Sequence, residues 1–253
     1  MKQALKSKIQ TWSLSPSPFL RALARSLRAL GHVRRFLLNP RIRSENLTRI
    51  FHRDSHFQGA TFSEPNRYPE LFAACKLHLQ NIPAPTILSF GCATGEEAFS
   101  LAEVLPNATI VGVDINRWCL RQCAKKNRTP RIRFLHTLAP EFPALGPFDA
   151  IFAMAVFQRS ENRTSTAPTA HGSFTFTKFD QEIARLDAKL KPGGLFFIDH
   201  ADFAFEDTAV AAHYTLLAFP GSEFAHDRPL FGRDNALIAT QFTAHRAFVK
   251  RGV

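Results

Sequence analysis

The sequence predicts an α/β protein with a doubly wound, mostly parallel sheet and a helical N-terminal extension. Three observations carry this prediction. Short apolar runs alternate with helical segments after residue 81, a turn with two glycines follows the first run, and an acidic residue ends the second. Such alternation is typical of βαβ units, which form parallel sheets of the Rossmann-like type. We therefore expect an extension over residues 1–80 and a Rossmann-like domain over residues 81–253.

The N-terminal extension is strongly basic. Residues 1–44 contain ten Lys or Arg and no Asp or Glu, so they account for most of the net charge of +11. Leu20, Leu23 and Leu27 recur at helical spacing and predict an amphipathic helix that ends near Gly31, or continues through a later apolar stripe. This helix could pack on the main domain with its arginines in solvent. Alternatively, residues 1–44 could dock on an anionic membrane, RNA or an acidic protein.

Composition also bounds the location and the kind of site. No apolar stretch reaches the roughly 18 residues that cross a bilayer, and no secretory signal is evident, so we expect a cytoplasmic protein, with peripheral membrane attachment as an alternative. The four cysteines, Cys75, Cys92, Cys119 and Cys123, form no CxxC pair. We expect free thiols and no metal site.

The predicted sheet follows from the apolar runs. We expect strands over residues 86–90, 109–113, 132–135, 148–153 and 195–199, with residues 237–239 and 247–250 as its final strands. The segments 96–105, 117–126 and 179–190 have the pattern of helices. Before the last of these helices, the polar stretch 158–178 predicts a long loop, which in compact domains is often a lid, a binding loop or a disordered insert.

The strongest local signal is the turn that follows the first strand. Gly91 and Gly95 stand between an apolar strand and a helix that begins near Glu96. Glycines permit a tight turn and close approach of a ligand, and the N-terminus of a helix presents free amides. The pattern indicates a nucleotide site, although an ordinary strand-to-helix turn can also contain two glycines.

The second signal is Asp114, which ends the next strand nineteen residues after Gly95. An acid at this point in a βαβ unit accepts hydrogen bonds from ribose hydroxyls. Alternatively, Asp114 or Asn116 could cap the helix that begins near Arg117. The turn lacks the Gly-x-Gly-x-x-Gly fingerprint and no Gly-Lys-Ser/Thr follows it, so NAD, FAD and a Walker loop are disfavoured.

Taken together, these residues resemble those of the class I S-adenosylmethionine-dependent methyltransferases. The turn over residues 91–97 is most similar to that of the chemotaxis-receptor glutamate methyltransferases, and similar features continue in order at residues 113–116, 148–153 and 190–195. The chain departs from this family at Ser89, where many members have an acid, and at His136 and Thr137. The arginine and asparagine typical of the chemotaxis enzymes are replaced near residues 153–155, which argues against a receptor glutamate as substrate.

The resemblance implies S-adenosylmethionine as cofactor and ten residues that bind it. They are Gly91, Cys92, Ala93, Thr94, Gly95, Glu97, Asp114, Ile115, Met154 and Ala155. Glu97 would face the ammonium group of the cofactor, Asp114 would hold the ribose and Ile115 would contact the adenine. Met154 and Ala155 would form the floor near the sulfonium.

We expect the acceptor to be a small molecule with an oxygen or nitrogen nucleophile. The alternatives are an RNA or protein methyltransferase that docks through the basic N-terminus, and a non-catalytic cofactor-binding scaffold; no DNA partner is expected. Methyl transfer requires a general base only when the nucleophile arrives protonated. His171, His200, Asp202, His213 and Tyr214 are in segments that could supply one, but no spacing selects among them.

Overall fold

The computed structural model describes residues 2–53, 57–59, 61, 63–162, 168–170 and 172–252. The chain divides into two compact units, Met1–Ile50 and Phe51–Val253. Residues 51–80, which the sequence assigned to the extension, are therefore part of the second unit. The predicted functional division at residue 80 stays a prediction.

The first unit is helical, as the sequence predicts. It contains α1 (Lys2–Ser13), α2 (Pro18–Leu38) and most of α3 (Pro40–Phe51). Of the two ends predicted for the amphipathic helix, the one at Gly31 is wrong and the continuation is confirmed, because α2 extends to Leu38, with Asn39 as its C-cap. Asn39 precedes Pro40, and the proline ring disfavours helical backbone in the residue before it. Within the described residues, no helix has the length and apolar character needed to cross a membrane.

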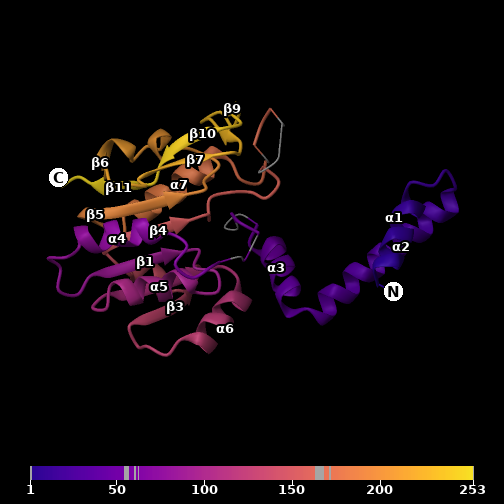
Figure 1. Ribbon diagram of the computed structural model, residues 1–253, viewed down its shortest axis with the longest axis horizontal. Helices are drawn as coiled ribbons and strands as arrows, with labels where there is room; N and C mark the ends of the chain where they lie inside the picture. Colours follow the sequence, from indigo (N-terminus) through magenta and orange to yellow (C-terminus); the bar gives the residue numbers. More distant parts are fainter. Residues whose placement is uncertain are drawn as a thin grey trace. The chain divides into compact units, whose positions relative to one another are not determined.

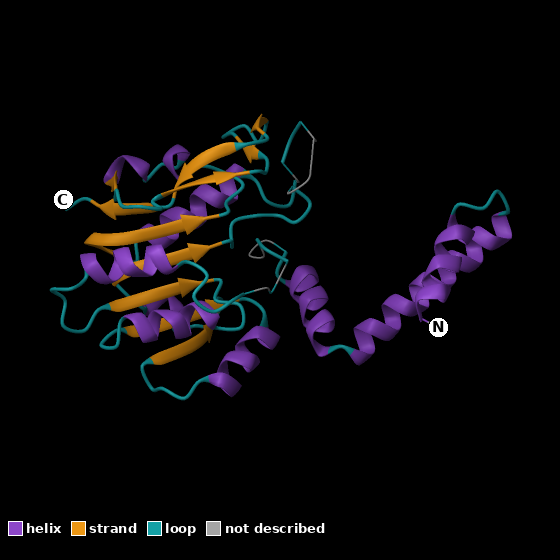
Figure 2. Ribbon diagram, viewed as in Figure 1, coloured by secondary structure: helices purple, strands orange, loops and turns teal. Residues whose placement is uncertain are grey.

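The second unit is built on a seven-stranded sheet with the order β3-β2-β1-β4-β5-β11-β6 (Figures 1 and 2). Its parallel strands are β1 (Thr86–Phe90), β2 (Thr109–Asp114), β3 (Ile132–His136), β4 (Phe148–Met154) and β5 (Leu190–Asp199). β11 (Ala247–Lys250) runs antiparallel to both β5 and β6 (Tyr214–Leu216). The doubly wound, mostly parallel fold and the final strand at residues 247–250 are confirmed.

One predicted strand lies elsewhere. β9 (Leu237–Ala239) pairs with β8 (Leu230–Phe231) in a separate two-stranded sheet, so its assignment to the main sheet is wrong. The chain reverses direction after Phe231, where the Gly232 amide donates to the Ala236 carbonyl and Asn235 has a positive φ. β10 (Phe242–His245) forms a second small sheet with β7 (Glu223–His226).

Helices cover both faces of the main sheet (Figure 1). α4 (Pro69–His78) and α5 (Glu96–Val104) pack on one face, where Ile87 belongs to their apolar cluster. α7 (Phe176–Asp187) packs on the other face, in the cluster that holds Leu88. Neighbouring residues of β1 thus face opposite layers, because side chains alternate along a strand. α6 (Arg117–Lys126) lies against β2 and β3.

The order of the strands locates the site. The chain leaves β1 toward β2 and β3 and then returns to place β4 on the other side of β1. This reversal is a topological switch point, and open α/β sheets bind ligands beyond the carboxyl ends of the strands at such a point. The turns after β1, β2 and β4 all lie at that edge.

Candidate active site

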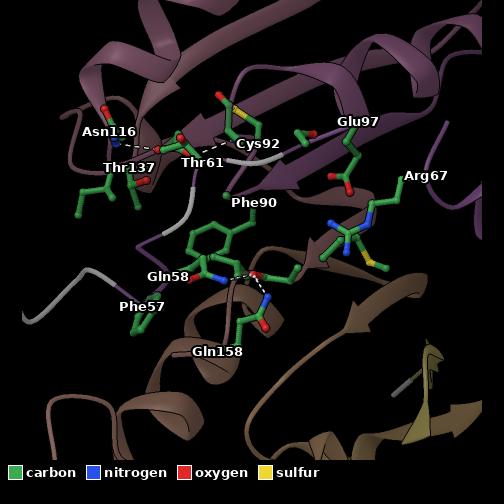
Figure 3. A pocket seen from close by; sticks show the side chains of 18 of the residues that line it. Phe57, Gln58, Thr61, Arg67, Phe90, Cys92, Glu97, Asn116, Thr137 and Gln158 are labelled. Atoms are coloured by element: carbon green, nitrogen blue, oxygen red, sulfur yellow. Dashed lines mark hydrogen bonds between the residues drawn. The ribbon is translucent and has the colours of Figure 1, made fainter. Parts of the chain in front are cut away.

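A cavity of about 360 Å³ opens at the carboxyl ends of β1, β2 and β4 (Figure 3). The volume is within the range typical of small-molecule sites. Its walls come from the turns after these strands, from α4 and α5, and from the segment before α4. We call that last part the pre-α4 segment; its described residues are 57–59, 61 and 63–68.

Eight of the ten residues predicted for the cofactor line this cavity. They are Gly91, Cys92, Ala93, Glu97, Asp114, Ile115, Met154 and Ala155. Thr94 and Gly95 do not line it. The Thr94 hydroxyl donates a hydrogen bond to the Glu96 carboxylate at 2.5 Å. Gly95 is the N-cap residue of α5 and lies near the side chains of Phe99 and Cys123. Both belong to the turn that shapes the cavity, and cofactor binding by all ten stays a proposal.

The backbone of the turn after β1 requires a glycine at residue 91. Gly91 has a φ of 76°, and a Cβ atom there would lie 2.6 Å from Cγ2 of Val156. The Gly91 and Cys92 amides both donate to the Val113 carbonyl of β2, at 2.9 and 3.0 Å. The turn is therefore bent back against the neighbouring strand, which exposes its far side to the cavity.

Asp114 holds this turn from β2. Its Oδ2 accepts a hydrogen bond from the Ala93 amide at 2.9 Å and its Oδ1 accepts one from the Asn116 amide at 2.7 Å. Asn116, not Asp114, caps α6, since its side chain accepts from the Trp118 amide at 2.9 Å. Burial raises the pKa of Asp114 to about 6 against the opposing effect of the backbone donors. The capping interpretation of Asp114 is therefore wrong.

Glu97 brings a second carboxylate into the cavity from the first turn of α5. Its Oε1 accepts a hydrogen bond from the Ser89 hydroxyl at 2.6 Å. Burial raises the pKa of Glu97 to about 7, although the Ser89 bond and the charge of Arg67 both act to lower it. Many members of the resembled family have an acid at the position of Ser89. In this chain, Ser89 near the end of β1 instead donates a hydrogen bond to Glu97, an acid of α5.

The pre-α4 segment contributes residues that sequence reasoning missed. Arg67 extends toward Glu97 across the cavity, and Gln58 approaches from the opposite wall (Figure 3). Tyr68 also lines the cavity, and its buried hydroxyl makes no hydrogen bond with any described residue. The segment precedes the sheet and has no glycine motif or spacing, so the sequence offered no signal for it.

The turn after β4 supplies a carbonyl acceptor at the floor. Ala155 has a φ of 58°, an uncommon conformation for a residue with a Cβ atom. Its carbonyl accepts a hydrogen bond from Gln158 Nε2 at 2.9 Å and a longer one from Gln58 Nε2 at 3.5 Å. Two glutamine amides therefore fix the floor of the cavity.

The turn after β3 completes the side near Ile115. Thr137 lines the cavity, whereas His136 packs behind it and its Nε2 lies 2.9 Å from the Ile115 carbonyl. Burial lowers the pKa of His136, so the neutral ring is favoured. His136 therefore positions Ile115, and Thr137 is the group that faces the cavity.

The candidate bases separate in space. Tyr214 donates to Asp187 at the amino end of β5, so Tyr214 and the adjacent His213 lie at the opposite edge of the sheet from the cavity. Asp202 is buried in an ion pair with Arg228. His200 follows β5 at the carboxyl edge of the sheet, where the cavity also lies. His171 lies outside the described residues.

Sequence comparison identifies the domain. Residues 87–194 match the family model described as a methyltransferase domain. The match covers less than half of the chain and supports S-adenosylmethionine as the cofactor. None of the curated protein sequences matches the chain.

Several solved structures are similar to this chain at low sequence identity. TrmN from Thermus thermophilus is 17% identical over 81% of this chain and 53% of its own, with a TM-score of 0.45. Precorrin-6y C5,15-methyltransferase from Geobacter metallireducens is 13% identical over 79% and 96%, with a TM-score of 0.43. A putative caffeoyl-CoA O-methyltransferase from Staphylococcus aureus is 16% identical over 62% and 66%, with a TM-score of 0.38. The chain spans between 20% and 66% of the first three structures that it matches.

The residues of the cavity fit this cofactor. S-adenosylmethionine carries an ammonium group, a carboxylate and ribose hydroxyls, and the cavity offers two buried carboxylates and a guanidinium. Burial raises the pKa of both acids, and the charge of Arg67 offsets this effect only in part at Glu97. A cationic ligand would supply a further positive charge.

Proposed function

We propose that this chain transfers the methyl group of S-adenosylmethionine to an oxygen or nitrogen atom of a small molecule. The observation that carries the proposal is the cavity at the switch point, where Glu97 and Asp114 stand on one side and Met154 and Ala155 on the floor. The cofactor supplies a methyl group that its sulfonium already activates. The protein then has to align the reactants and exclude water, for which effective-molarity arguments allow about 7–11 kcal/mol.

Five side chains would orient the cofactor. Glu97 would pair with its ammonium group and Asp114 with its ribose hydroxyls. Arg67, which extends toward Glu97, has the charge to bind the carboxylate of the methionine part. Thr137, rather than His136, would meet the adenine side together with Ile115.

The lining of the cavity supports a small acceptor. Phe57, Phe72 and Phe90 line the same cavity as Met154, so aromatic side chains form part of its walls. The pre-α4 segment closes one side with Gln58 and Tyr68. A cavity of this size with aromatic walls suits a small organic molecule better than a nucleic-acid strand, for which basic grooves with stacked aromatics are typical.

The proposal is tested with methyl-labelled S-adenosylmethionine and a panel of small hydroxyl and amino compounds, RNA and protein. Label should enter the small-molecule fraction. Asp114→Asn keeps a side-chain oxygen for the Ala93 amide yet removes the charge, so it should lower cofactor affinity by about tenfold. Label in RNA or protein alone would overturn the acceptor class. Cofactor binding without transfer to any class would favour a non-catalytic scaffold.

A further inference from the structure

Three side chains meet at the carboxyl end of β5. The carboxylate of Asp199 lies 3.2 Å from Nδ1 of His200 and 3.1 Å from Nε2 of His226, both measured to its Oδ1. His226 comes from β7, 26 residues further along the chain than His200. Within the described part of the chain, these residues form a group whose potential ligand atoms all lie within 4.8 Å of one another.

The spacing suits a single metal ion. Ligand atoms at the usual 2.0–2.2 Å from a zinc-type ion lie about 3.0–3.5 Å from each other. Both distances to Asp199 fall in that interval. Moreover, Nδ1 of His200 is buried, and the contact that it makes with Asp199 points it toward the centre of the group.

The backbone at His200 is held in an uncommon conformation. Its φ is 51°, in the left-handed region. Histidine visits this region more often than most residues with a Cβ atom, but such positions still cost free energy and cluster at functional sites. Here the conformation brings the ring of His200 beside the carboxylate of the residue that precedes it.

Surrounding groups fix the cluster. Arg246 Nη1 contacts Oδ2 of Asp199 at 3.3 Å, which leaves Oδ1 facing the two histidines, while Glu70 pairs with Arg246 Nη2 at 2.8 Å. Two carboxylates therefore share one guanidinium, and the local charge without the histidines is −1. The ring of Phe242 stacks on His226 with centroids 4.9 Å apart. Oriented ligands of this kind are typical of metal sites.

We propose that Asp199, His200 and His226 bind one divalent transition-metal ion of the Zn²⁺ type. Two imidazoles and a single carboxylate favour such an ion over Mg²⁺ or Ca²⁺, which prefer all-oxygen ligands. No metal-ligand spacing is evident in the sequence, because the third ligand reaches the site only through the fold.

The position of the cluster gives the ion a role that rests on the proposed function. Three protein ligands leave a coordination position open, and a second cavity of about 240 Å³ lies against all three residues. Asp199 pairs in register with Met154 of β4, and its carbonyl accepts from the Ala155 amide at 2.9 Å. The ion would sit one strand away from the floor of the methyl-donor cavity, and its open position would face the second cavity, where an oxygen-containing ligand would bind.

The test is metal binding by the full chain, measured by calorimetric titration with ZnCl₂ and by visible absorption with CoCl₂. One ion per chain is expected. His200→Ala and His226→Ala should each weaken binding by at least about tenfold. His213→Ala is the matched control, because this exposed histidine lies at the opposite edge of the sheet and should leave binding unchanged.

The metal site would be overturned if the wild type bound neither Zn²⁺ nor Co²⁺. It would also be overturned if His200→Ala and His226→Ala bound the metal as tightly as the control His213→Ala. Titration of the same variants with S-adenosylhomocysteine shows whether they are folded and separates the two proposals. Binding of S-adenosylhomocysteine without metal refutes the metal site alone. Stoichiometric metal without S-adenosylhomocysteine binding retains the site and refutes the proposed function.

Discussion

The carboxyl group of Glu97 should make cofactor binding depend on pH. Burial raises its pKa to about 7, and only the ionised form attracts an ammonium group. Affinity must therefore fall as the pH falls below 7. A carboxyl group with this pKa is about 50% ionised at pH 7 and about 1% ionised at pH 5, so the contribution of Glu97 to affinity should fall by up to about 50-fold, or roughly 2.3 kcal/mol.

The assay is calorimetric titration with S-adenosylhomocysteine at pH 7 and pH 5, on the wild type and on two variants. Glu97→Gln should bind weakly at pH 7 and lose most of the pH dependence; the remainder is expected from Asp114, whose pKa is about 6. Glu96→Gln is the matched control, since Glu96 pairs with Lys126 and its pKa is lowered. Equal pH dependence in the wild type and Glu97→Gln would refute the reasoning.

Two further predictions concern the turn and the N-terminal unit. Gly91→Ala should destabilise the fold by about 1–3 kcal/mol in urea unfolding, because its Cβ would clash with Val156 at a positive φ, whereas Gly31→Ala, in open space within α2, should not destabilise it. An undiminished stability of Gly91→Ala would contradict the geometry of the turn. We also propose that residues 1–44 bind anionic lipid. Deleting them should abolish sedimentation of the protein with phosphatidylserine vesicles, and unchanged sedimentation of the shortened protein would contradict this proposal.

Local patterns in the sequence predicted the frame of the site. The four strands β1 to β4 agree with the predicted ranges to within one residue, because each is an apolar run bounded by turn residues. The turn at Gly91 and the acid at Asp114 are likewise encoded at short range. The family resemblance that these motifs carry implied eight of the residues that line the cavity.

Contacts made over long distances in the sequence could not be predicted in this way. Arg67 reaches Glu97 only because α4 packs on the sheet, and His226 reaches Asp199 only through the β7–β10 hairpin. The misplaced strand β9 has the same cause. Its apolar run has no local feature that distinguishes a main-sheet strand from a small hairpin, and the turn after Phe231 decides the outcome.

The central claim is that the cavity beyond β1, β2 and β4 binds the methyl-donor cofactor. The most direct measurement is calorimetric titration of the full chain with S-adenosylhomocysteine, with NAD as the control ligand and Asp114→Asn as the control variant. The account predicts binding of S-adenosylhomocysteine at one site per chain, no binding of NAD, and a clear loss of affinity in the variant. Binding of neither ligand, or an affinity unchanged in Asp114→Asn, would contradict it.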